Sequence, residues 1–210
     1  RNQRRLDSFR DGVELVENAK SADLLAGHAG QGSDTPLDVA HYHGLYPTAM
    51  GMDGGNYFTI NAHVIRNLRA AKAITAPSNW IADVIRRDMH VAPHIIGWGV
   101  NTDEWTPGED PHVYVLWNKA RVDTVSNPAP MLELAAQMPD MPFLTTFGNG
   151  GMNVRTIGRQ PYEVMKHYIR NAGVYLATVT ETFGIGTLEA MACGVPVLGF
   201  NHAGTADIVE

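Results

Sequence analysis

The sequence predicts an α/β fold built on parallel β-sheets. Short apolar segments alternate with amphipathic segments along most of the chain, which is the pattern of repeated β-α-β units. Most of the apolar segments are continuous and do not alternate with polar residues, as expected of strands buried on both faces. With 210 residues the chain is long enough to form one domain or two small ones, each with its own core.

The order of these segments gives the expected elements. Strands are expected at residues 37–41, 73–76, 94–96, 113–117, 143–147, 174–177 and 195–198. Helices are expected at residues 13–25, 58–71, 79–88, 130–138, 162–171 and 186–193. Ser78 precedes the third helix and is a suitable N-cap, because its hydroxyl can accept from a free backbone N–H. Gly194 follows the last helix, where a left-handed capping residue is common.

Composition excludes several classes of function. The chain has 22 acidic and 16 basic residues, a net charge of −6, which argues against a nucleic acid as the main partner. Its single cysteine excludes an internal disulfide and fits a reducing compartment, so we expect a cytoplasmic protein. No apolar run approaches the roughly 20 residues that a transmembrane helix needs.

The most informative segment is ETFGIGTLEAMACGVPVLGF, residues 181–200. Glu181 and Glu189 flank a Gly-X-Gly turn that opens a helix, and Gly184 and Gly186 would let an anion approach the backbone closely. The free N–H groups and the dipole of a helix N-terminus suit a phosphate. Carboxylates can accept hydrogen bonds from sugar hydroxyls. The segment therefore predicts a pocket for a sugar that carries a phosphate.

These residues resemble a known family. ETFGIGTLEAMACGVPV is similar to the donor-site signature of retaining glycosyltransferases of family 4, which have the GT-B fold. DVAHYHGLYP (38–47), AKAITAPSNWIADVI (71–85) and GVNTDEWTP (99–107) also resemble parts of this family, so the resemblance covers most of the chain from Asp38 onward. It implies two Rossmann-like parallel-sheet domains that face each other across a cleft.

Composition and the resemblance together indicate how the chain is divided. The polar, proline-containing residues 101–111 are the expected linker. A partial N-terminal, acceptor-side domain is expected over residues 1–105, reduced because fewer than 40 residues precede Asp38. A C-terminal nucleotide-sugar domain is expected over residues 106–210, ending earlier than in the family. An incomplete N-terminal domain would expose apolar sheet faces, so a homo-oligomer is left open.

The family pattern assigns the donor contacts residue by residue. Glu189 would hold the ribose hydroxyls and Glu181 the transferred sugar. The backbone of Phe183, Gly184 and Ile185 would contact the diphosphate or the sugar. The family in general needs no metal, and the resemblance implies no cofactor other than the nucleoside-diphosphate sugar as donor substrate.

Three further residues come from segments that match the pattern less closely. The family usually has a Gly-Arg pair and a later Lys after the first strand of the C-terminal domain. Here the segment reads LWNKARVDTVSNP, so Lys119 and Arg121 are the available cations for a phosphate; the alternative is a pair of solvated loop cations. His43 comes just past the C-terminal end of a strand, where α/β folds place ligands. The family often has a histidine at the matching place, so the resemblance implies a catalytic residue near the transferred sugar or the acceptor. The alternative is a surface histidine packed on a neighbouring tyrosine.

The function that the resemblance implies is retaining transfer of a hexosyl unit from a nucleoside-diphosphate sugar to an acceptor hydroxyl. The alternative is a non-catalytic or degenerate module that only binds a nucleotide sugar. The short N-terminal region and the altered phosphate segment favour that alternative. The base, the sugar and the acceptor are not predicted by the sequence.

Overall fold

A computed structural model of the chain describes residues 22–28, 36–44, 57–109, 113–119 and 125–209. The described strands form two parallel sheets, one with the strand order β1-β2-β3-β4 and one with the order β7-β6-β5-β8-β9. The chain also divides into two compact units, Arg1–Ile74 and Thr75–Glu210. The fold is therefore α/β with two parallel sheets, as the sequence predicts.

The first unit contains β1 (Ala26–His28), β2 (Val39–His41) and α2 (Tyr57–Ala70). The strands β1 and β2 pair in parallel, with His28 opposite His41. Helix α2 buries Val64 and Leu68 on one side, at the helical spacing that the sequence predicts.

The expected helix over residues 13–25 lies mostly outside the described residues, and its described end differs from the prediction. Residues 22–25 are not helical, and β1, which the sequence did not predict, begins directly after them. The segment is rich in alanine and glycine and lacks β-branched residues, so it carries little strand signal.

The second unit begins with the end of β3 (Ala73–Ala76), then α3 (Asn79–Met89) and β4 (His94–Ile95). Ser78 is the N-cap of α3, since its hydroxyl accepts from the N–H of Ile81 at 3.2 Å. This confirms the capping role predicted from the sequence.

The second sheet is complete within this unit. Its strands are β5 (Val115–Trp117), β6 (Phe143–Thr145), β7 (Val154–Thr156), β8 (Val174–Ala177) and β9 (Val197–Gly199). Its helices are α4 (Ala129–Gln137), α5 (Tyr162–Arg170), α6 (Ile185–Ala192) and the 3-10 helix η2 (Ala203–Asp207). Strand β7 is at one edge of the sheet and was not predicted from the sequence.

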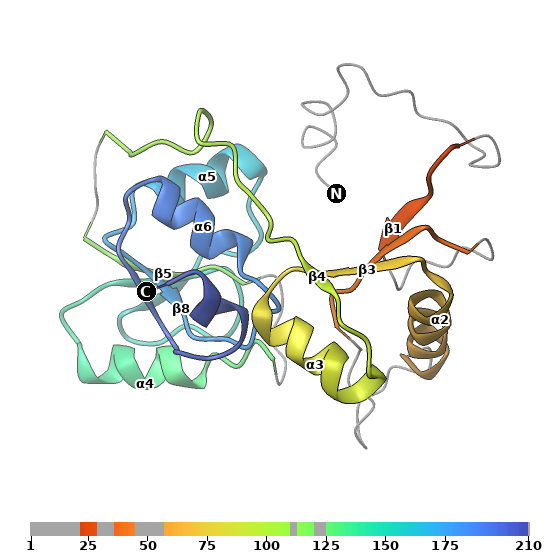
Figure 1. The fold of residues 1–210 in the computed structure, drawn as a ribbon. Coiled ribbons are helices and arrows are strands. Elements are labelled where there is room, and N and C mark those ends of the chain that lie inside the picture. Colours follow the sequence, from red (N-terminus) through yellow and green to blue (C-terminus); the bar gives the residue numbers. More distant parts are fainter. Residues whose placement is uncertain (1–21, 29–35, 45–56, 110–112, 120–124, 210) are drawn as a thin grey trace. The chain divides into compact units, whose positions relative to one another are not determined.

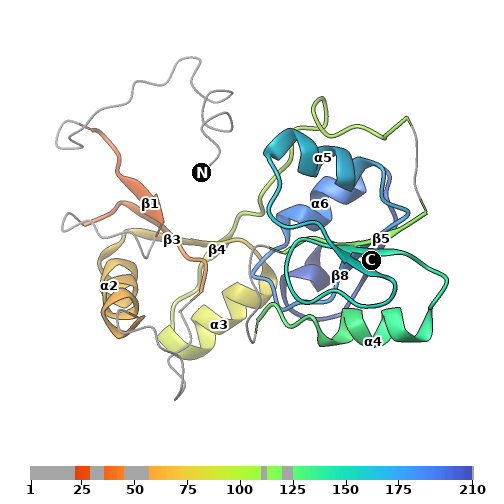
Figure 2. The ribbon, with the colours of Figure 1, turned by 180° about the vertical axis from the view of Figure 1, so that it is seen from behind.

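Helices cover both faces of this sheet. Helices α5 and α6 lie on one face and α4 on the other (Figures 1 and 2), and each face has its own apolar core. Leu116 and Tyr175 point into the core under α5 and α6, whereas Trp117 and Leu176 point into the core under α4. Successive residues of a strand face opposite sides, which explains why these strands are apolar throughout.

The strand order determines where a ligand can bind. The chain runs from β5 outward to β6 and β7, and then returns to β8 and β9 on the other side of β5. The neighbours β5 and β8 are therefore the point at which the strand order reverses. In open α/β sheets the crevice at this point, outside the carboxyl ends of the strands, is the usual ligand site.

Candidate functional site

The turn between β8 and α6 carries the Gly-X-Gly sequence. Gly184 has φ 108° and precedes α6, and its carbonyl accepts from the N–H of Thr187 at 3.0 Å. A left-handed φ of this size favours glycine. Gly186 is required for a different reason, because a Cβ at this position would overlap the hydroxyl of Tyr175. The space beside Gly186 is thus filled by a protein side chain, although the sequence suggested that an anion would approach there.

Lys119 and Glu181 form an ion pair at the carboxyl ends of β5 and β8. Only 7% of the Lys119 side chain is exposed, against 32% of that of Glu181. The N–H of Lys119 donates to the Thr146 hydroxyl at 2.8 Å, and this hydroxyl donates to the carbonyl of Lys119 at 2.6 Å. Because its backbone is held at both groups and its side chain is buried and ion-paired, Lys119 is a fixed cation at the carboxyl end of β5 and not a solvated loop residue.

Tyr175 lies beneath this ion pair. Its ring is buried, and its centroid is 5.9 Å from Nζ of Lys119. Burial tends to lower the pKa of Lys119, but its contacts with Tyr175 and Glu181 outweigh burial and raise this pKa. Lys119 therefore stays protonated although it is buried. Tyr175 was not predicted as a site residue. The signal in the sequence is that a residue with a hydroxyl group lies within a strand that is expected to be buried.

Glu189 lies on α6 and is 6% exposed, as expected for a carboxylate on a mostly buried helix. Burial is the main cause that raises the pKa of Tyr175, and the negative charges of Glu181 and Glu189 add to it. Both carboxylates of the sequence motif are thus close enough to affect the same phenol. The helix ends as predicted, with Gly194 at φ 71°.

The loop that carries Glu181 is held by segments from elsewhere in the second unit. The hydroxyl of Ser78 donates to the carbonyl of Thr182 at 2.6 Å, and the N–H of Gly204 donates to the carbonyl of Glu181 at 2.9 Å. Phe183 is buried, with its ring 5.6 Å from that of Trp98 in an edge-to-face arrangement. The backbone that the family pattern assigns to the diphosphate or the sugar is therefore fixed before any ligand binds.

Of the three remaining predicted residues, one lies in this turn, one is outside the described residues and one belongs to the first unit. Ile185 is the first residue of α6, in the same turn as Phe183 and Gly184. Arg121 lies outside the described residues. His43 belongs to the first unit, where it forms a second cluster of titratable side chains.

This second cluster consists of His28, His41 and His43. The rings of His28 and His43 stack with their centroids 4.6 Å apart and are joined by an Nδ1 to Nε2 hydrogen bond, while His41 is 4.8 Å from His43. Burial, followed by the repulsion of His28 and His41, lowers the pKa of His43 to about 4. Burial and His28 also lower the pKa of His41. At neutral pH His43 is therefore a neutral imidazole that can donate or accept a hydrogen bond.

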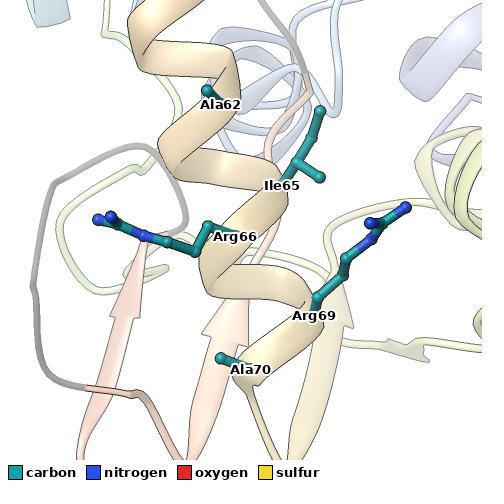
Figure 3. A pocket seen from close by; sticks show the side chains of 5 residues that line it. All are labelled: Ala62, Ile65, Arg66, Arg69 and Ala70. Carbon is teal, nitrogen blue, oxygen red and sulfur yellow. The ribbon is translucent and has the colours of Figure 1, made fainter.

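A surface pocket of about 560 Å³ lies along α2 in the first unit. Figure 3 shows the residues that line it, with Arg66 and Arg69 projecting to opposite sides of the helix. It contains none of the residues that the sequence assigns to the site. Its size alone gives it no chemical role.

Two kinds of feature are absent from the described residues. Within that part of the chain, no three His, Cys, Asp or Glu side chains are arranged to hold a metal ion. Among the helices described above, none has the length and apolar character needed to cross a membrane.

Comparison with known sequences relates this site to a family. Residues 148–210 match the family described as "Glycosyl transferases group 1". These residues include α6 and both motif carboxylates. The chain is also 30% identical over 194 residues to the phosphatidyl-myo-inositol mannosyltransferase of Propionibacterium freudenreichii subsp. shermanii. The match covers 84% of this chain and 49% of that protein, so the chain spans about half the length of the relative it matches.

Comparison with solved structures relates the fold to known enzymes. Sucrose-phosphate synthase from Thermosynechococcus elongatus superimposes with a TM-score of 0.63 and 18% identity, over 81% of this chain and 52% of that one. HepE of Anabaena, solved with UDP and glucose, also gives a TM-score of 0.63, with 15% identity over 83% of this chain and 55% of that one. The chain therefore has the two parallel-sheet α/β architecture of the GT-B type, and its residues 148–210 carry the glycosyl transferase group 1 motif.

Proposed function

We propose that this chain belongs to a retaining, GT-B type hexosyltransferase that uses a nucleoside-diphosphate sugar as donor and a hydroxyl group as acceptor. One observation carries the proposal: Lys119 and Glu181 meet at the N-terminus of α6, at the point where the strand order of the second sheet reverses. The match of residues 148–210 to group 1 glycosyl transferases supports it.

Each group in this crevice has a chemical task that fits its surroundings. The ammonium of Lys119 and the N–H groups at the start of α6 supply positive charge for a diphosphate. The buried carboxylate of Glu189 accepts from the ribose hydroxyls, and the more exposed Glu181 accepts from hydroxyls of the transferred sugar. The Lys119 ammonium and the N–H groups of α6 are already in place, so they need little reorganisation when the diphosphate leaves.

The proposed transfer breaks the bond between the anomeric carbon and the diphosphate oxygen and forms a bond from that carbon to the acceptor oxygen on the same face of the sugar. The acceptor hydroxyl gives its proton to the departing diphosphate, so no protein group is consumed. Lys119 stabilises the negative charge that develops on the diphosphate. We assign His43 a contact with the transferred sugar or the acceptor, in which its imidazole is neutral.

Two further features complete the proposal. Lys119 and the N-terminus of α6 neutralise the diphosphate in place of a metal ion, so activity should persist in excess chelator. The single cysteine, Cys193, is a free thiol buried in the core, which fits a reducing compartment and a cytoplasmic location.

Calorimetric titration with UDP-glucose and GDP-mannose tests the donor site. Glu189→Ala should weaken binding of the preferred donor roughly 10- to 100-fold, because hydrogen bonds to a charged group are lost. Glu133→Ala is the matched control, since Glu133 is an exposed carboxylate on α4. Unchanged affinity in Glu189→Ala would exclude the ribose assignment.

Release of free nucleotide in the presence of acceptor alcohols tests turnover. We expect release in wild type, with and without chelator, and inversion or retention is read from the anomeric configuration of the product. Donor binding without any release would contradict the enzymatic part of the proposal. Absence of binding to either nucleotide sugar would contradict all of it.

A further inference from the structure

Tyr175 is a hydroxyl-bearing side chain in the middle of β8, and it is 1% exposed. It faces the core under α5 and α6, whose other members include Leu116, Ile169 and Ala190. A phenol buried in such a core needs a hydrogen-bond partner, because an unpaired hydroxyl there is costly. Lys119 lies beside it, with its Nζ 5.9 Å from the centroid of the phenol ring, and the two side chains interact electrostatically.

The phenol also lies against the start of α6. A Cβ on Gly186, the second residue of α6, would overlap the hydroxyl of Tyr175 and lie 3.3 Å from the ring carbon that bears it. The second glycine of the Gly-X-Gly turn therefore makes room for this hydroxyl. The phenol, the Lys119 ammonium and the first turn of α6 are thus fitted to one another.

The two partners of Lys119 differ in how firmly they are held. Tyr175 is fixed within a central strand, whereas Glu181 lies on a loop with 32% of its side chain exposed. In the proposed reaction Glu181 turns to the hydroxyls of the transferred sugar. Lys119 is buried, so it would then need another group to keep its ammonium protonated and in place.

We propose that the Tyr175 hydroxyl is a positioning residue that holds the Lys119 ammonium at the N-terminus of α6 while Glu181 contacts the transferred sugar. This inference rests on the proposed function of the same crevice. Tyr175 itself does not reach the reacting atoms in this account; it acts through Lys119. Gly186 contributes to the same arrangement, because any larger residue there would displace the phenol from its place beside Lys119.

The test combines donor binding with a direct observation of Lys119. The chain has four lysines, so ¹³C-labelled lysine gives few side-chain NMR signals, and that of Lys119 is identified by its loss in Lys119→Met. Tyr175→Phe should lower the pKa of Lys119 and weaken UDP-glucose or GDP-mannose binding about tenfold, as expected for one hydrogen bond to a charged group. Tyr114→Phe is the matched control, since Tyr114 is buried in the same core and donates to the carbonyl of Tyr168 at 2.7 Å.

The outcomes separate this inference from the proposed function. In a Lys119→Met background, Tyr175→Phe should change donor affinity less than about twofold, since a positioning residue has nothing left to position. Unchanged Lys119 titration and unchanged binding in Tyr175→Phe would overturn the inference. If wild type binds no nucleotide sugar, the proposed function fails, and the Lys119 titration still decides whether Tyr175 holds the ammonium. If Tyr175→Phe does not fold, Gly186→Ala displaces the phenol from the other side and must change the same signal.

Discussion

Two clusters of titratable side chains lie at the carboxyl ends of parallel strands in this protein. They differ in the kinds of charged group that they combine. His28, His41 and His43 bring three bases together in the first unit. Lys119, Glu181 and Glu189 surround Tyr175 in the second unit and combine a cation with two carboxylates. Similar strand geometry therefore supports two kinds of electrostatic environment.

The difference shows how composition determines charge in a partly buried site. Burial, followed by the repulsion of the two neighbouring imidazoles, lowers the pKa of His43 to about 4, so the ring is neutral at physiological pH. In the other cluster the carboxylate and phenol raise the pKa of Lys119 against the effect of burial. His43 therefore offers a neutral hydrogen-bonding group, which suits the hydroxyl of the proposed acceptor, and Lys119 offers a fixed charge, which suits the diphosphate of the proposed donor.

The largest expected effect comes from removing the negative partner of Lys119. Glu181→Gln leaves a buried ammonium beside a neutral amide, and the free energy of unfolding should fall by about 2 kcal/mol, less than for a fully buried pair because Glu181 is partly exposed. Urea denaturation measures this, with Glu133→Gln on the exposed side of α4 as control. Equal stability of the two variants would show that Lys119 does not depend on Glu181.

A smaller effect is expected from a change that acts on the phenol through the backbone. Gly186→Ala places a methyl group where the Tyr175 hydroxyl lies, and this overpacking should lower the free energy of unfolding by roughly 1–2 kcal/mol. In a Tyr175→Phe background the same substitution should cost much less, because the hydroxyl is gone and alanine favours the helix. Additive effects of the two changes in thermal unfolding would contradict the contact.

The smallest expected effect is the pH dependence of the histidine cluster. The folded pKa of His43 is about 4 and its ordinary value is 6.5, so the unfolded chain takes up the proton first. Stability should be full above pH 6.5 and should fall by about 1 kcal/mol as the pH drops toward 4, after allowance for the partial exposure of the ring. His43→Asn should flatten this slope in denaturant titrations at several pH values, and a slope unchanged by the substitution would contradict the cluster.

For the cluster around Lys119 we expect the opposite pH dependence, with stability lost at high pH. Because the pKa of Lys119 is raised above 10.5, its contribution to stability is present below that pH and is lost as the pH rises through the folded value. Lys119→Met should remove this alkaline loss while leaving the acid slope of His43 intact. The difference between wild type and Lys119→Met in one set of denaturant titrations isolates this contribution from the alkaline loss that the raised pKa values of Tyr114 and Cys193 also cause.

Much of the fold could be predicted from local sequence. The strands β3 and β8, the helix α3 with its Ser78 cap, and the left-handed Gly194 all follow from short patterns of residues. The strands β1 and β7 were missed, because each is three residues long and at an edge of its sheet, where hydrophobic patterning is weak.

The candidate site was predicted only in part. The two glutamates are eight positions apart, so a short sequence motif contains both. Lys119 and Glu181 are separated by 62 positions and meet because β5 and β8 are neighbouring strands. Tyr175 depends on the same strand pairing, so its role could not be seen in the sequence. His28 joins His43 across β1 and β2, and β1 itself was not predicted.

The most direct test of the account compares two ligands that differ only in the diphosphate sugar. Calorimetric titration of the preferred nucleotide sugar and of its parent nucleoside is carried out with wild type and with Lys119→Met, using Lys166→Met as the control for loss of a partly buried lysine. The account predicts about 100-fold weaker binding of the nucleotide sugar to Lys119→Met, as for loss of a charge-assisted contact, and equal binding of the nucleoside. Equal affinity of wild type and Lys119→Met for the nucleotide sugar would contradict the claim that Lys119 is the fixed charge of a donor site.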